Sequence, residues 1–92
     1  MRTILKYDVA IGRFEVKMPT GARVLDAQGQ DGRPVMWVQT WGEPTLEKRI
    51  FQVFGTGQEI PQDLGPEMFK YRATFQMGPM VWHLYEVDIL PF

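Results

Sequence analysis

The sequence predicts an all-β protein: a small antiparallel β-sandwich or a partly open barrel of about seven strands. Three observations predict this fold class. Apolar and polar residues alternate with a period of two along most of the chain, as in strands that bury one face. Turn residues separate these stretches at intervals of about ten residues. Hardly any stretch shows the spacing of an amphipathic helix.

Seven stretches are predicted to be strands, and the pattern is weakest in 22–28, where the apolar residues Val24 and Leu25 are adjacent. They are residues 3–11, 13–18, 22–28, 35–41, 48–54, 71–77 and 80–90. The first two are separated by Gly12 and are predicted to pair as a hairpin. Asp31-Gly32 is a strong turn signal, because both residues tolerate positive φ. Stretches 35–41 and 48–54 are apolar on both faces, which predicts central strands or strands that meet a partner.

Three further expectations concern the second half of the chain. Residues 55–66 contain three glycines and two prolines without periodicity, which predicts a long loop with one short helical turn near residues 66–69. In 71–77, strict alternation predicts that Tyr71 shares a face with Ala73 and Phe75. The first and last strands are expected to be neighbours, because pairing them would tie down both termini.

Size and composition limit the possible functions. The 92 residues are predicted to form a single domain, 1–92, because they are too few for two independent cores. A hydrophobic content of 45% excludes a disordered tail. A net charge of −1 without a basic block disfavours nucleic-acid binding.

The residue types that are missing exclude several chemistries. There is no cysteine, so disulfides, thiolate nucleophiles and cysteine-ligated zinc are excluded and a reducing cytoplasm is expected. There is also no serine, which removes any serine-nucleophile mechanism. No apolar run fits a signal peptide or a membrane span, so no membrane association is expected.

Gly55-Thr56-Gly57 has two interpretations. The backbone N–H groups can converge on an anion, as in the glycine-rich loops of nucleotide sites. Such sites usually continue into a helix, which Pro61 opposes, and neither a Walker-type lysine nor the G-x-G-x-x-G spacing is present. The sequence therefore favours a structural turn, with a ligand loop as the alternative.

His83 is the only histidine, and its imidazole is a candidate acid or base near neutral pH. Catalysis would require an orienting carboxylate and a nucleophile. Glu86 is predicted to lie on the opposite face of the strand, so it does not supply that carboxylate. The sequence favours a half-buried histidine whose ring nitrogens are hydrogen-bonded within the sheet.

The sequence contains more tryptophans than the core of so small a domain requires, namely Trp37, Trp41 and Trp82. Tryptophan is enriched at interfaces, and apolar residues on both faces of two strands suggest incomplete burial within one chain. A homodimer or a partner surface would complete this burial. The alternative is that large aromatics form the whole core of a small sandwich.

Three motifs carry a family resemblance: Met18-Pro19 with Gly21-Ala22, Phe54-Gly55-Thr56-Gly57 and Val81-Trp82-His83. With them, residues 6–87 resemble a family of small uncharacterised bacteriophage and prophage proteins. Members often carry histidine where this chain has Gln58, so a role of that histidine does not transfer to Gln58. The resemblance implies a phage origin and a compact fold, and it implies no activity.

The leading hypothesis is a phage- or prophage-encoded, non-enzymatic binding protein that acts on a host protein in the host cytoplasm and forms a homodimer. Trp37, Trp41 and Trp82 would anchor the contact. One alternative is a binder of a nucleotide-like anion through Arg49, Gly55, Thr56, Gly57, Gln58 and His83. Another is a minor structural virion protein. No nucleophile–base–orienter set can be assembled, so no catalytic residue, metal or cofactor is predicted.

Overall fold

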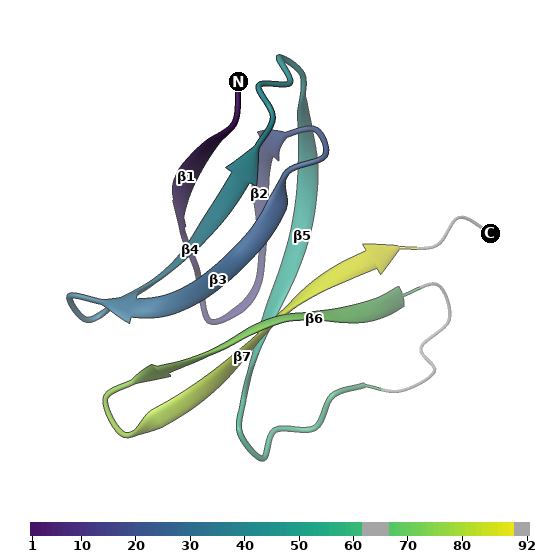
Figure 1. The fold of residues 1–92 in the computed structure, drawn as a ribbon. Helices are drawn as coiled ribbons and strands as arrows, with labels where there is room; N and C mark the ends of the chain where they lie inside the picture. Colours follow the sequence, from purple (N-terminus) through teal and green to yellow (C-terminus); the bar gives the residue numbers. More distant parts are fainter. Residues whose placement is uncertain (62–66, 90–92) are drawn as a thin grey trace.

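Seven strands form two antiparallel sheets in the computed structural model, which describes residues 1–61 and 67–89 (Figure 1). The strands are β1 Thr3–Asp8, β2 Gly12–Pro19, β3 Arg23–Gln30, β4 Arg33–Thr40, β5 Leu46–Gly55, β6 Glu67–Met77 and β7 Met80–Ile89. One sheet has the order β1-β4-β3 and the other has the order β2-β5-β7-β6. The all-β prediction is confirmed in its sandwich form, because the two sheets do not close into a barrel.

The predicted hairpin around Gly12 is wrong, because β1 and β2 belong to different sheets. β1 pairs with β4, while β2 pairs with β5. The chain crosses between the sheets at Val9, which is buried and whose N–H donates to the carbonyl of Pro34. The expected pairing of the first and last strands is also wrong, since β7 lies between β5 and β6. Alternation predicts strands, but it carries no information about their partners.

The core lies between the inner faces of the two sheets. Met36 and Val38 of β4 face Phe51 and Val53 of β5 and Leu84 of β7, and all five are at most 1% exposed. Burying such a side chain contributes about 1.5–3 kcal/mol relative to leaving it in water. These residues all come from stretches with the predicted period-two pattern.

The four-stranded sheet also buries apolar residues on its outer face. Phe54 is 3% exposed, and its ring meets Phe69 and Tyr85 edge-on, with centroids 5.7 Å apart in both pairs. Val87 of β7 is also buried there, opposite Ile50. The prediction that stretch 48–54 is apolar on both faces is therefore confirmed.

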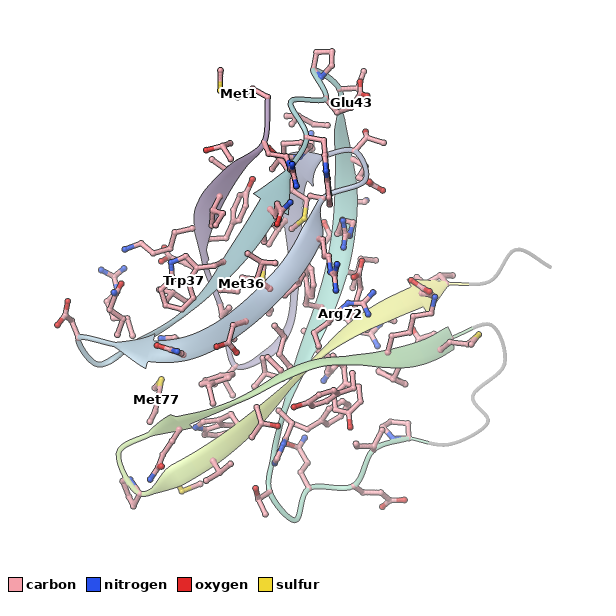
Figure 2. The ribbon with its side chains drawn as sticks, in the orientation of Figure 1. Met1, Met36, Trp37, Glu43, Arg72 and Met77 are labelled. Carbon is pink, nitrogen blue, oxygen red and sulfur yellow. The ribbon has the colours of Figure 1, made fainter. Side chains whose placement is uncertain are left out.

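The β3–β4 hairpin has the predicted two-residue turn. Asp31 and Gly32 have φ angles of 51° and 75°, as a type I′ turn requires. Close to this hairpin β3 approaches β6, the edge strand of the other sheet. A Cβ on Gly29 would lie 2.7 Å from Met77 Cγ and 2.9 Å from the Gln76 carbonyl oxygen, so only glycine permits this approach. The Met77 side chain points from β6 toward β3 in Figure 2.

A β-bulge in β6 changes which of its side chains face the core. The register with β7 shifts between Tyr71 and Ala73, so Arg72 is an extra residue in the strand. Ala73 and Phe75 are buried between the sheets, whereas Tyr71 packs against Tyr85 on the outer face. The predicted shared face of Tyr71 and Ala73 is therefore wrong, because strict alternation cannot include a bulge.

The loop between β5 and β6 is described only in part. Residues 56–61 are not in a strand, as predicted. The expected helical turn near residues 66–69 is wrong for residues 67–69, which form the start of β6, and residue 66 lies outside the described residues. No helix in the described parts of the chain is long and apolar enough to cross a membrane.

Candidate functional site

The structure separates the candidate residues into three regions. At one end of the four-stranded sheet lie Gly55, Thr56, Gly57, Gln58, Trp82 and His83. Trp37 and Trp41 belong to the other sheet or directly follow it. Arg49 is six residues before Gly55 on β5, which is about 20 Å along an extended strand. The Gly-Thr-Gly stretch and Arg49 are therefore not brought together.

Gly55 to Gln58 form a tight turn. Gln58 N–H donates to the Gly55 carbonyl oxygen at 3.0 Å, and Gly57 has a φ of 89°. Gly55 N–H donates to Gln58 Oε1 at 3.0 Å, and Thr56 N–H donates to the Val81 carbonyl oxygen at 3.1 Å. Three of the four N–H groups that could face an anion are thus already bonded within the protein.

His83 lies in a chain of hydrogen bonds on the outer face of the four-stranded sheet. Thr56 Oγ1 donates its single proton to the Val81 carbonyl oxygen at 3.2 Å, so His83 Nε2 donates to Thr56 Oγ1 at 2.8 Å. His83 Nδ1 is then the acceptor for Thr74 Oγ1 at 3.1 Å, and Thr74 Oγ1 accepts from the Tyr71 hydroxyl at 2.7 Å. Both ring nitrogens are bonded, which is the structural arrangement that the sequence favours.

The three tryptophans serve in different places. Trp82 is half-buried and packs against the core, and its ring lies 3.2 Å from where a Cβ on Gly55 would be. Trp37 is on the outer face of the three-stranded sheet, where it pairs with Lys6 of β1 and Asp26 of β3. Trp41 follows β4 and is 49% exposed.

Arg49 belongs to a buried ion cluster on the inner side of the four-stranded sheet. Glu86 of β7 is 6% exposed and accepts hydrogen bonds from Arg49 Nε and Nη2 and from Arg72 Nε and Nη2, at 2.5–3.1 Å. Arg49 Nη1 also donates to the carbonyl oxygen of Ala22 at 2.7 Å, which links β5 to the connection between β2 and β3. Its hydrogen bonds to Glu86 raise the pKa of Arg49 above its ordinary value, against the opposing effect of burial.

A pocket opens beside this cluster, between the edge strands β3 and β6. Its volume is about 330 Å³, and it is lined by Ala22, Arg23, Val24, Arg49, Tyr71 and Arg72. We call this the arginine pocket. Among the residues that the structure describes, its lining contains three arginines and no acidic residue. A second groove of about 430 Å³ shares Arg49 but is lined by Glu47, Glu86 and Asp88 as well. The arginine pocket is therefore the more positive of the two.

Comparison with known proteins places the chain in a family. The sequence model of the family described as Domain of unknown function (DUF7352) matches residues 1–89. The chain belongs to the DUF7352 family. No curated protein and no solved structure matches it.

In this DUF7352 domain, sequence reasoning missed Glu86 and Arg72 as members of a site. A signal for Glu86 was present, because it alternates with Trp82 and Leu84 on the apolar face of its strand. A carboxylate on a core-facing position requires a cationic partner. Arg72 carried no such signal, since only the bulge brings it to Glu86.

The described residues offer no cluster of three or more histidine, cysteine or acidic side chains able to hold a metal.

Proposed function

We propose that this DUF7352 domain is a non-enzymatic binding protein that contacts a protein partner through the outer face of its three-stranded sheet. The observation that supports this is an exposed apolar surface on that side. Ile4 of β1 is 57% exposed, Trp41 directly after β4 is 49% exposed, and Trp37 of β4 is half-buried. We call these three residues the tryptophan face. A sandwich needs apolar residues only where its sheets meet, so the fold does not require them here.

The strand register explains how this surface arises. Trp37 lies on the central strand β4, and Ile4 of β1 pairs with Gln39 two positions further along β4. Residues two apart on a strand point to the same side, so Ile4 and Trp37 share the outer face. A shallow hollow lined by Arg2, Thr3, Ile4 and Gln39 lies beside them. A hollow next to a large aromatic surface suits a side chain of a partner protein.

The partner that we propose is a protein of the host cytoplasm. The resemblance to small phage and prophage proteins favours a host factor, and a second copy of this chain is the alternative partner. Tryptophan supplies much of the binding energy at protein interfaces because it buries a large, rigid area. The net charge of −1 argues against nucleic acid as the partner.

Affinity capture from host lysate, with native mass spectrometry of the purified protein, tests the proposal. The double variant Ile4→Gln/Trp41→Gln removes exposed apolar area from the tryptophan face. The matched control, Ile89→Gln/Met80→Gln, changes residues of the other sheet that are 55% and 50% exposed. We expect a stoichiometric partner, or a dimer, that the first variant loses and the control retains.

Two results would contradict the proposal. One is a wild-type protein that is monomeric and captures no stoichiometric partner. The other is equal loss of the partner in both variants, which would place the contact elsewhere or indicate general destabilisation. Thermal unfolding of both variants distinguishes these causes, because exposed positions are expected to change stability by about 0.5 kcal/mol or less.

A further inference from the structure

The arginines of the arginine pocket carry hydrogen-bond donors that have no acceptor among the described residues. Arg72 bonds Glu86 through Nε and Nη2, and within the described residues its Nη1 group has no acceptor. Arg49 uses one N–H on each of Nε, Nη1 and Nη2. A guanidinium has five N–H donors, so both arginines retain donors without an acceptor in the described part of the chain. Both residues also line the pocket.

Glu86 holds these guanidinium groups in place. Its two oxygens accept four hydrogen bonds, two from each arginine. Arg49 is further fixed by its bond to the Ala22 carbonyl oxygen. A long side chain that is already ordered loses little conformational entropy when it binds a ligand. The ion cluster therefore orders the two arginine side chains before a ligand binds, so that they can donate to a ligand oxygen in addition to Glu86.

The position of Glu86 leaves the pocket positive. Glu86 neutralises one of the two guanidinium charges, but it is buried and is not among the residues that line the pocket. Arg23 is a third arginine in the lining. Because a small domain gains little net stability from a buried ion cluster, a binding role gives a reason to retain it.

We propose that the arginine pocket binds a small molecule through an oxyanion, a phosphate or carboxylate group that accepts hydrogen bonds from Arg72 and Arg49. Guanidinium groups match the paired oxygens of both anions. A volume of about 330 Å³ is at the lower end of the range for small-molecule sites, so the ligand is a small metabolite and not a polymer. This site does not depend on the proposed protein partner.

Titration of the full chain with inorganic phosphate and, separately, with acetate tests the site, with chloride holding the ionic strength constant. The NMR signals of the Nε–H groups of Arg49 and Arg72 report binding directly. We expect saturable shifts of both signals with at least one of the two anions. The anion that binds more tightly identifies the preferred headgroup.

Two variants locate the binding. Arg72→Gln removes donors from the pocket but leaves Glu86 paired with Arg49, and we expect the dissociation constant to rise about tenfold or more. Arg13→Gln is the matched control. Arg13 lies on β2, makes two hydrogen bonds to Glu67 of β6 and is not among the residues that line the pocket. This variant is expected to change the dissociation constant less than about twofold.

The proposal is overturned if neither anion shifts the arginine signals in a saturable way. It is also overturned if Arg13→Gln weakens binding as much as Arg72→Gln does, because that would indicate general surface attraction. The wild-type arginine signals decide the matter even if Arg72→Gln does not fold.

Discussion

The Gly55–Gln58 turn and the arginine pocket both present groups that can hold an anion, but they differ in what those groups already bind. In the turn, the N–H groups of Gly55, Thr56 and Gln58 are bonded to acceptors within the protein. In the pocket, Arg49 and Arg72 bond Glu86 and still have donors that meet no acceptor within residues 1–61 and 67–89. The two regions differ because a guanidinium carries five hydrogen-bond donors and a backbone amide carries only one.

This difference shows that a sequence motif predicts a binding site only when the hydrogen-bond partners of its donors are known. Gly55-Thr56-Gly57 resembles an anion loop in sequence, but Val81 and Gln58 take up its donors. Val81 is 25 residues from Thr56, so whether Thr56 finds a hydrogen-bond acceptor depends on how the strands of the sheet pair. The contribution of Arg72 to the pocket depends likewise on the bulge in β6.

The largest expected effect comes from removing the group that holds the arginines. Glu86→Ala leaves Arg49, whose side chain is 13% exposed, without its charged partner. Breaking one side of a buried ion pair is expected to lower the free energy of unfolding by about 3 kcal/mol. Urea denaturation measures this. Glu67→Gln is the control, since Glu67 pairs with the more exposed Arg13, and a similar loss in both variants would contradict the account.

A smaller effect is expected at the turn. His83→Ala removes two hydrogen bonds to threonine hydroxyls, and the free energy of unfolding should fall by about 1 kcal/mol. The dissociation constant for phosphate should not change, because His83 lies outside the pocket. A parallel loss of stability and of phosphate affinity would show that the two regions form a single site.

The smallest effect is expected from pH at the exposed ion pair. Hydrogen bonds from Arg13 lower the pKa of Glu67 below its ordinary value of 4.5. Glu67 therefore adds stability that is fully present above about pH 4.5 and is lost as the pH falls through the lowered pKa. The stability difference between wild type and Glu67→Gln should stay constant from about pH 7 to about pH 4.5 and shrink as the pH falls further. A difference that does not shrink below about pH 4.5 would contradict the pairing.

The sequence was sufficient to predict the strands but not their arrangement. The buried residues Met36, Phe51 and Leu84 lie in stretches that the alternation predicts as strands, and Asp31-Gly32 predicts a turn that the structure contains. The side of a strand on which a residue lies is a local property of the backbone. Which strands pair is decided by burial over the whole chain, so β1 and β2 are in separate sheets despite their short connection.

The candidate site was predictable to a lesser extent. The opposite faces of His83 and Glu86 followed from the period of two, and the structure shows Glu86 buried and His83 on the outer side. Arg49 was predicted to take part in an anion site, but its hydrogen-bond partners Glu86 and Ala22 lie on another strand and in a loop. A bulge and a contact between sheets are not encoded in the pattern of a single strand.

The central claim is that free donors, and not glycine content, decide where this domain binds an anion. Backbone ¹H–¹⁵N spectra recorded during a phosphate titration test it most directly. The account predicts saturable shifts of the amides of residues 22–24 and 71–72, with those of residues 55–58 unchanged. Saturable shifts confined to residues 55–58 would contradict it.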